Sequence, residues 1–203
     1  MCNSTMATMS TPTIVLAHGA GAGQGHPWMR HVAAELEARG FRVVTFDQPY
    51  MAQGRKLPDK APVLEAEFVR VWEEAARNAT GPMFAAGKSM GGRMASMVAA
   101  RKGFDPAPAG LVFLGYPLHP PGKPEQRRDR HLPGITVPML FVHGTKDPFG
   151  TPDEMTGLVQ GLPAARLHLV DKGDHSLITK RGQPVSSDVI DRVVDWTRQS
   201  DQK

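Results

Sequence analysis

The stretch PMFAAGKSMGG, residues 82–92, decides the fold. Its first half, PMFAA, is a short apolar run typical of a buried strand, and residues 89–102 carry a helical pattern that Gly103 closes. Between the two, Gly87, Ser89 and Gly91 match the pattern G-x-S-x-G. In this pattern the serine occupies a sharp, strained turn, and the flanking glycines let the strand and the helix approach each other closely. The stretch therefore predicts an exposed serine nucleophile at the end of a strand.

Strand-like runs and helical patterns alternate on both sides of this turn. Further strands are predicted at residues 13–17, 41–46, 111–114, 137–142 and 165–170. Helices are predicted at residues 27–40, 60–79, 89–102, 152–162 and 186–198. Such alternation predicts an α/β fold with a mostly parallel sheet of about six strands and helices on both faces. We expect one domain over residues 13–200, preceded by a flexible tail over residues 1–12.

Composition narrows the functional classes. The chain has 203 residues, of which 40% are hydrophobic and 22% charged, as in an ordinary globular domain. No apolar run is long enough to span a membrane, and residues 1–13 lack a secretory signal pattern. With one cysteine, Cys2, no internal disulfide forms, and no metal-ligand spacing such as H-E-x-x-H occurs. The net charge of +4 comes without nucleic-acid motifs. We expect a cytoplasmic protein with no cofactor, metal, nucleic-acid or membrane partner.

A serine nucleophile needs a base, and the base needs an orienting acid. Residues that follow the strands of a parallel sheet meet at one edge of it, where ligands bind. His175 follows the last predicted strand and is the predicted base. Asp147 follows the fifth strand and is the predicted acid, with Asp171 and Asp174 as competitors.

The loop after the first strand, HGAGAG at residues 18–23, is the predicted source of oxyanion donors. Its glycines let backbone N–H groups point inward at little steric cost. We predict that the N–H groups of Ala20 and Met90 form the oxyanion hole. His18 and His143, each directly before a glycine at a strand end, are expected to brace their turns.

These features together resemble the α/β-hydrolases. The resemblance rests on the turn at residues 87–92, the loop at residues 18–23, Asp147 after its strand and the sequence GDH at residues 173–175. It spans about residues 13–198, and the chain order serine, aspartate, histidine is that of this superfamily. The segments LAHGAGAG, GKSMGGR, YPLHPPGKPE and HGTKDPFG are similar to small, lidless, dienelactone-hydrolase-related proteins. Dienelactone hydrolases themselves have a cysteine nucleophile where this sequence has Ser89.

The resemblance implies a three-layer α/β-hydrolase fold without a cap domain. Large members insert a cap after the fourth strand, where this chain has only the proline-rich stretch 117–134. The site is therefore expected to be open, and the net positive charge of this stretch indicates either a preference for anionic substrates or a solvated loop. Residues after the second and fourth strands are the predicted substrate-binding walls, namely Tyr50, Arg55, Tyr116 and His119.

The implied function is a serine hydrolase that cleaves an ester-type bond in a small acyl substrate, as a carboxylesterase or thioesterase does, through Ser89, His175 and Asp147. Two alternatives stay open: an acyltransferase, and a non-catalytic interaction module on the same fold. Nucleotide binding is disfavoured, because the Walker A pattern ending at Ser89 needs a glycine where Pro82 stands.

Overall fold

The structure is a computed structural model that describes residues 10–200. Most of the tail expected over residues 1–12 lies outside the described residues, as does Cys2. Along the described part of the chain, no helix has both the length and the apolar character needed to cross a membrane.

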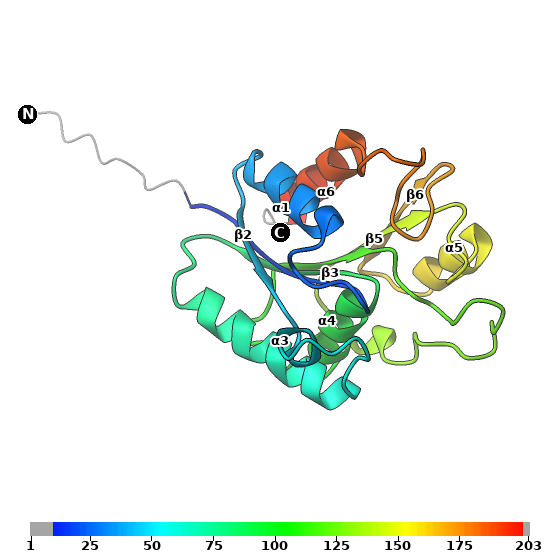
Figure 1. Cartoon of the computed structure of the whole chain (residues 1–203). Coiled ribbons are helices and arrows are strands. Elements are labelled where there is room, and N and C mark those ends of the chain that lie inside the picture. The colour runs from blue at the N-terminus through cyan, green and yellow to red at the C-terminus, as the bar shows by residue number, and fades with distance from the viewer. Residues whose placement is uncertain (1–9, 201–203) are drawn as a thin grey trace, which may run out of the picture.

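The centre of the molecule is a sheet of six strands (Figure 1). They are β1 (Thr13–Ala17), β2 (Arg42–Phe46), β3 (Met83–Lys88), β4 (Gly110–Leu114), β5 (Met139–Gly144) and β6 (Ala165–Val170). The strand order is β2-β1-β3-β4-β5-β6, and every pairing is parallel. Every residue of β1, β4 and β5 is buried, as expected for apolar strands covered on both faces. The parallel α/β sheet predicted from the sequence is confirmed.

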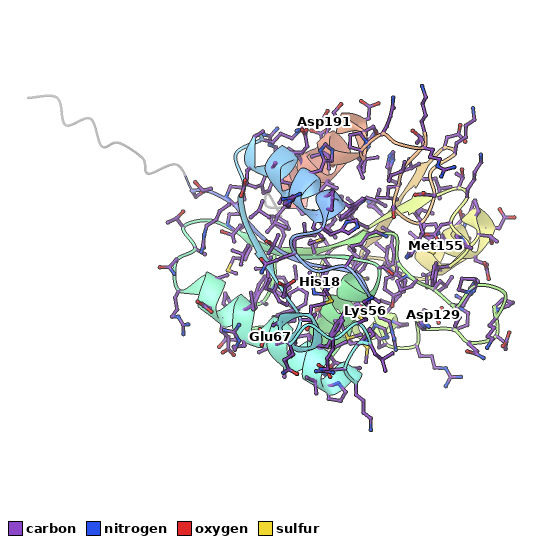
Figure 2. All side chains as sticks on the ribbon, viewed as in Figure 1. His18, Lys56, Glu67, Asp129, Met155 and Asp191 are labelled. Carbon is purple, nitrogen blue, oxygen red and sulfur yellow. The ribbon has the colours of Figure 1, made fainter. Side chains whose placement is uncertain are left out.

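Helices cover both faces of the sheet, which gives three layers (Figure 1). On one face, α1 (Pro27–Glu37) and α6 (Ser187–Ser200) pack on a cluster that contains Ile14 and Leu16 of β1. On the other face, α3 (Ala61–Ala76), α4 (Met90–Ala100) and α5 (Pro152–Gln160) pack on a cluster that contains Val15 and Ala17. Neighbouring residues of β1 thus enter opposite cores, as the alternation of side chains along a strand requires. Figure 2 adds the side chains to the same view.

The structure departs from the predicted elements in a few places. A short helix, α2 (Pro49–Ala52), and a 3-10 turn, η1 (Leu132–Gly134), were not predicted. Both have a proline in the first turn, whose fixed φ suits that position. Strand β3 runs to Lys88, two residues further than expected, so Ser89 follows it directly. Residues 117–134 contain no regular element besides η1, and within residues 10–200 no cap domain covers the sheet edge.

Candidate active site

Ser89 occupies the turn between β3 and α4 with φ 50° and ψ −114°, a left-handed conformation that is strained for a serine. The turn holds this shape because its neighbours are glycines. A Cβ on Gly87 would overlap the backbone of Gly91, and a Cβ on Gly91 would overlap the carbonyl group of Ala17 in β1. The predicted requirement for glycine at both positions therefore has a direct steric cause.

Ser89, His175 and Asp147 form one chain of hydrogen bonds. The Oγ of Ser89 lies 2.8 Å from Nε2 of His175, and Nδ1 of His175 lies 2.8 Å from Oδ2 of Asp147. In the neutral tautomer with the proton on Nδ1, the imidazole donates to the carboxylate and its Nε2 accepts from the serine hydroxyl. Asp147 is 4% exposed, and its Oδ1 accepts a hydrogen bond of 2.9 Å from the backbone N–H of Phe149. The structure thus brings together the three side chains that the sequence singled out.

The two competing acids have other positions. Oδ1 of Asp174 accepts hydrogen bonds from the backbone N–H groups of Ser176 and Ile178, at 2.7 and 3.0 Å, and so fixes the loop that carries His175. Asp171 is exposed. Neither carboxylate hydrogen-bonds the imidazole, so Asp147 is its acidic partner.

The loop that carries His175 must cross two strands to reach Ser89. His175 follows β6, which lies three strands from β3, or about 14 Å across the sheet. Gly115, at the end of β4, lies under this crossing with φ +69°, and a Cβ there would be 2.6 Å from the carbonyl oxygen of His175. Lys88 donates a hydrogen bond of 2.5 Å from Nζ to the same carbonyl oxygen. The close approach at Gly115 and the hydrogen bond from Lys88 therefore fix the backbone of His175 and so position its imidazole.

His18 and His143 brace neighbouring turns, as expected. Nδ1 of His18 donates to the carbonyl of Gly19 at 2.7 Å, and Nε2 accepts from the backbone N–H of Gln48 at 2.9 Å. Nε2 of His143 donates to the carbonyl of Gly150 at 2.8 Å. Burial lowers the pKa of both imidazoles, which favours the neutral forms that these contacts require.

A cavity of about 560 Å³ opens beside Ser89 and His175. Ala20 and Met90 line it, and their backbone N–H groups donate no hydrogen bond to any residue between 10 and 200. Met90 is the first residue of α4, where N–H groups lack partners within the helix. Two backbone donors that have no partner within residues 10–200 therefore belong to residues at the wall of the cavity beside Ser89.

The four side chains predicted as substrate-binding walls do not line this cavity, so that expectation of placement is corrected. Tyr50 is buried, and its hydroxyl accepts from the N–H of Gly21 at 3.4 Å. Tyr116 is also buried and donates to the carbonyl of Arg128 at 2.8 Å. His119 contacts Glu154 at 3.2 Å, and Arg55 forms a two-pronged pair with Asp59 at 2.7 and 3.0 Å. The hydroxyl groups of Tyr50 and Tyr116 thus hold the loops that contain Gly21 and Arg128.

Sequence reasoning missed the side chains that do form the walls: Trp28, Lys88, Arg93, Arg128 and Phe149. Phe149 stacks on His175 with 4.1 Å between ring centres and 28° between planes. Trp28 donates from Nε1 to the carbonyl of Ser176 at 2.8 Å. The available signal was position in the chain, because Lys88 adjoins Ser89, Arg93 follows it by one helical turn, and Phe149 lies two residues after Asp147.

The electrostatics of the site are dominated by cations. Burial lowers the pKa of Lys88 from 10.5 to about 8, although the carboxylates of Asp147 and Asp174 oppose the shift. Nζ of Lys88 also lies 5.6 Å from the ring centre of Trp28. Over residues 10–200, no group of three or more His, Cys, Asp or Glu side chains is placed to hold a metal ion.

Comparison with known proteins places the chain in a family. A family model described as an alpha/beta hydrolase domain matches residues 10–200. The chain belongs to the alpha/beta hydrolases. Solved structures with a similar fold include Est1E from Butyrivibrio proteoclasticus with ferulic acid bound, at 14% identity and a TM-score of 0.77, covering 96% of this chain and 91% of that chain.

Two further structures resemble this hydrolase. A dienelactone hydrolase from Anabaena variabilis is 20% identical with a TM-score of 0.73, covering 95% of this chain and 88% of that one. A thermophilic esterase from Thermogutta terrifontis is 16% identical with a TM-score of 0.73, covering 95% of this chain and 91% of that one. Together with the family model, these similarities confirm the expected small alpha/beta hydrolase related to dienelactone hydrolase. At identities of 14–20%, the structural similarities by themselves show the fold.

Proposed function

We propose that the protein is a serine hydrolase that cleaves carboxylic ester bonds in small acyl substrates. The observation that carries the proposal is the continuous hydrogen-bond chain from Ser89 through His175 to Asp147, with 2.8 Å at both steps, at the wall of a cavity. The Thermogutta enzyme is named as an esterase, which supports ester bonds as the substrate class.

In the proposed mechanism, Ser89 attacks the acyl carbon of the ester. Its hydroxyl proton passes to Nε2 of His175, and Oδ2 of Asp147 stabilises the resulting imidazolium. The carbonyl oxygen becomes an oxyanion, which the N–H groups of Ala20 and Met90 stabilise, each worth a factor of about 10²–10³ in rate. The C–O bond to the alcohol then breaks as Nε2 returns the proton to the alcohol oxygen.

Water completes the cycle. His175 removes a proton from a water molecule, whose oxygen attacks the acyl-enzyme. The second tetrahedral intermediate collapses, the bond to Oγ of Ser89 breaks, and Nε2 returns the proton to that oxygen. The products are a carboxylic acid and an alcohol.

Ser89→Ala tests the assignment. We expect kcat for a p-nitrophenyl ester to fall by a factor of about 10⁴–10⁶ and covalent labelling by a fluorophosphonate to disappear. Thermal unfolding measured in parallel reports whether the variant is folded. Turnover at the wild-type rate in a folded Ser89→Ala variant contradicts the proposal.

Ser96→Ala is the matched control, because Ser96 lies on α4, the helix that directly follows Ser89, and also contacts a histidine. Its Oγ lies 2.7 Å from Nε2 of His131 but donates its proton to the carbonyl of Arg93 at 2.7 Å. Ser96 does not line the cavity. We expect the control variant to keep both the labelling and the turnover, with the fluorophosphonate adduct on Ser89 by mass spectrometry.

A further inference from the structure

Three cationic side chains line the cavity beside Ser89: Lys88, Arg93 and Arg128. Among residues 10–200, no Asp or Glu side chain lines the cavity with them. The carboxylate of Asp147 lies behind His175 and is engaged there. The wall that faces a substrate is therefore positively charged with no carboxylate to balance it.

Lys88 already has a partner, whereas the side chains of the two arginines have none among the described residues. Nζ of Lys88 donates to the carbonyl of His175 at 2.5 Å. Nε of Arg93 is buried without a hydrogen-bond partner, and within residues 10–200 neither Arg93 nor Arg128 forms an ion pair. Burial, and after it the positive charge of Arg93, lowers the pKa of Arg128. Both arginines line the same cavity as Ser89.

On the loop that carries Arg128, the arginine that forms an ion pair and the arginine that lines the active-site cavity lie side by side in the sequence. Arg127 pairs with Asp129, which Figure 2 labels, and together with Arg130 they line a different hollow on the surface. Arg128 faces the active-site cavity instead. Its backbone is fixed on both sides, because its N–H donates to Leu118 at 2.8 Å and its carbonyl accepts from Tyr116 at 2.8 Å.

Arg93 is equally fixed relative to the nucleophile. It follows Ser89 by one helical turn, and its N–H donates to the carbonyl of Ser89 at 3.1 Å. Two like charges in a partly desolvated cavity raise the free energy of the empty site. A carboxylate or phosphate group of the substrate that binds to both guanidinium groups removes that cost. The planar N–H donors of a guanidinium group match the oxygens of such an anion.

We propose that Arg93 and Arg128 form an anion subsite, and that the substrates are small esters carrying a carboxylate or phosphate group away from the scissile bond. This proposal rests on the proposed ester hydrolysis at Ser89. It gives the positively charged loop a role in substrate selection.

The test compares p-nitrophenyl esters that differ only at the far end of the acyl chain: the monoester of glutarate, the ester of 4-phosphonobutanoate, and the neutral pentanoate. After correction for spontaneous hydrolysis, we expect kcat/KM for an anionic ester to exceed that for the pentanoate by about ten- to a hundred-fold, the range expected for hydrogen bonds to a charged group. The preferred anionic ester distinguishes a carboxylate from a phosphate as the recognised group.

Arg93→Gln and Arg128→Gln each remove one guanidinium. We expect each to reduce the ratio of anionic to neutral kcat/KM about ten-fold, whereas Arg128→Lys restores part of the ratio. Arg127→Gln is the matched control, because it removes the same charge from the same loop outside the cavity, and we expect it to keep the wild-type ratio. Thermal unfolding of each variant confirms that it is folded.

Binding of glutarate and of inorganic phosphate to the Ser89→Ala variant, measured by calorimetry, reports on the subsite without turnover. We expect one of the two to bind, and binding to weaken about ten-fold when Arg128→Gln is added. Equal kcat/KM for anionic and neutral esters, or an equal loss in Arg127→Gln and Arg128→Gln, overturns the anion subsite and leaves Ser89-dependent hydrolysis standing. If instead no ester is hydrolysed and Ser89 is not labelled, the proposed function fails, and calorimetry alone decides the subsite.

Discussion

Replacing Asp147 with asparagine tests the orientation of His175 with a change of one atom. The carboxylate accepts on both sides, from Nδ1 of His175 at 2.8 Å and from the N–H of Phe149 at 2.9 Å. The amide of the Asp147→Asn variant has only one oxygen. If that oxygen keeps the Phe149 contact, the NH₂ group faces Nδ1 and must donate to it. If the amide turns over, NH₂ faces the N–H of Phe149, and two donors meet in a buried place.

The favoured orientation reverses the tautomer of the imidazole. Nδ1 becomes an acceptor, so the ring proton moves to Nε2, which lies 2.8 Å from Oγ of Ser89. Nε2 then has no lone pair to take the serine proton. We expect kcat for a p-nitrophenyl ester to fall about 10⁴-fold, which corresponds to about 5 kcal/mol of transition-state stabilisation. Stopped or continuous assays of p-nitrophenol release at saturating ester measure this loss directly.

Asp174→Asn is the control for this prediction. The oxygen of the new amide still accepts from the N–H groups of Ser176 and Ile178, so the loop keeps its contacts and we expect kcat within about three-fold of wild type. A fall of less than ten-fold in Asp147→Asn, or a similar fall in both variants, refutes the assignment of Asp147 as the orienting acid.

The remaining predictions concern stability. Gly91→Ala places a methyl group against the carbonyl group of Ala17, so we expect the free energy of unfolding to fall by about 1–3 kcal/mol or more in urea titrations. The control is Gly157→Ala on α5, where the added Cβ has no neighbour within 4 Å, and we expect it to stabilise the protein by up to about 1 kcal/mol. An equal loss of stability in both variants contradicts the steric argument. Because the pKa of Lys88 is lowered from 10.5 to about 8, the unfolded chain binds more protons between these values, and the free energy of unfolding should rise with pH across that interval in wild type relative to Lys88→Met. A pH-independent difference between the two proteins in urea unfolding contradicts this last prediction.

The sequence was sufficient for the sheet and for the placement of the triad because both follow from local rules. Apolar runs alternating with helical patterns predict parallel strands, and the residues after such strands meet at one edge. Ser89, Asp147 and His175 satisfy this rule and lie together in the structure. The steric demand at Gly87 is local as well, because its Cβ would meet Gly91, whereas the demand at Gly91 comes from Ala17 of the neighbouring strand β1.

The walls of the site were not predictable in this way, because they depend on where loop side chains point. Tyr116 follows β4 closely, but the positive φ of Gly115 turns the chain and Tyr116 enters the core. Tyr50 lies on the unpredicted helix α2 and is buried too. Arg128 reaches the cavity through backbone contacts with Leu118 and Tyr116, which no sequence pattern encodes.

A second serine–histidine contact in the same protein shows that a short distance between the two side chains does not by itself make a nucleophile. Ser96 and His131 approach to 2.7 Å, as close as Ser89 and His175 at 2.8 Å. Ser96 sits inside α4, where its hydroxyl donates to the carbonyl of Arg93, and burial together with the charge of Arg93 lowers the pKa of His131 to about 4. That imidazole is therefore a poor proton acceptor at neutral pH, and Ser96 has no access to the cavity. Ser89 differs because its strained turn lifts the hydroxyl off the helix and because Asp147 supports its histidine.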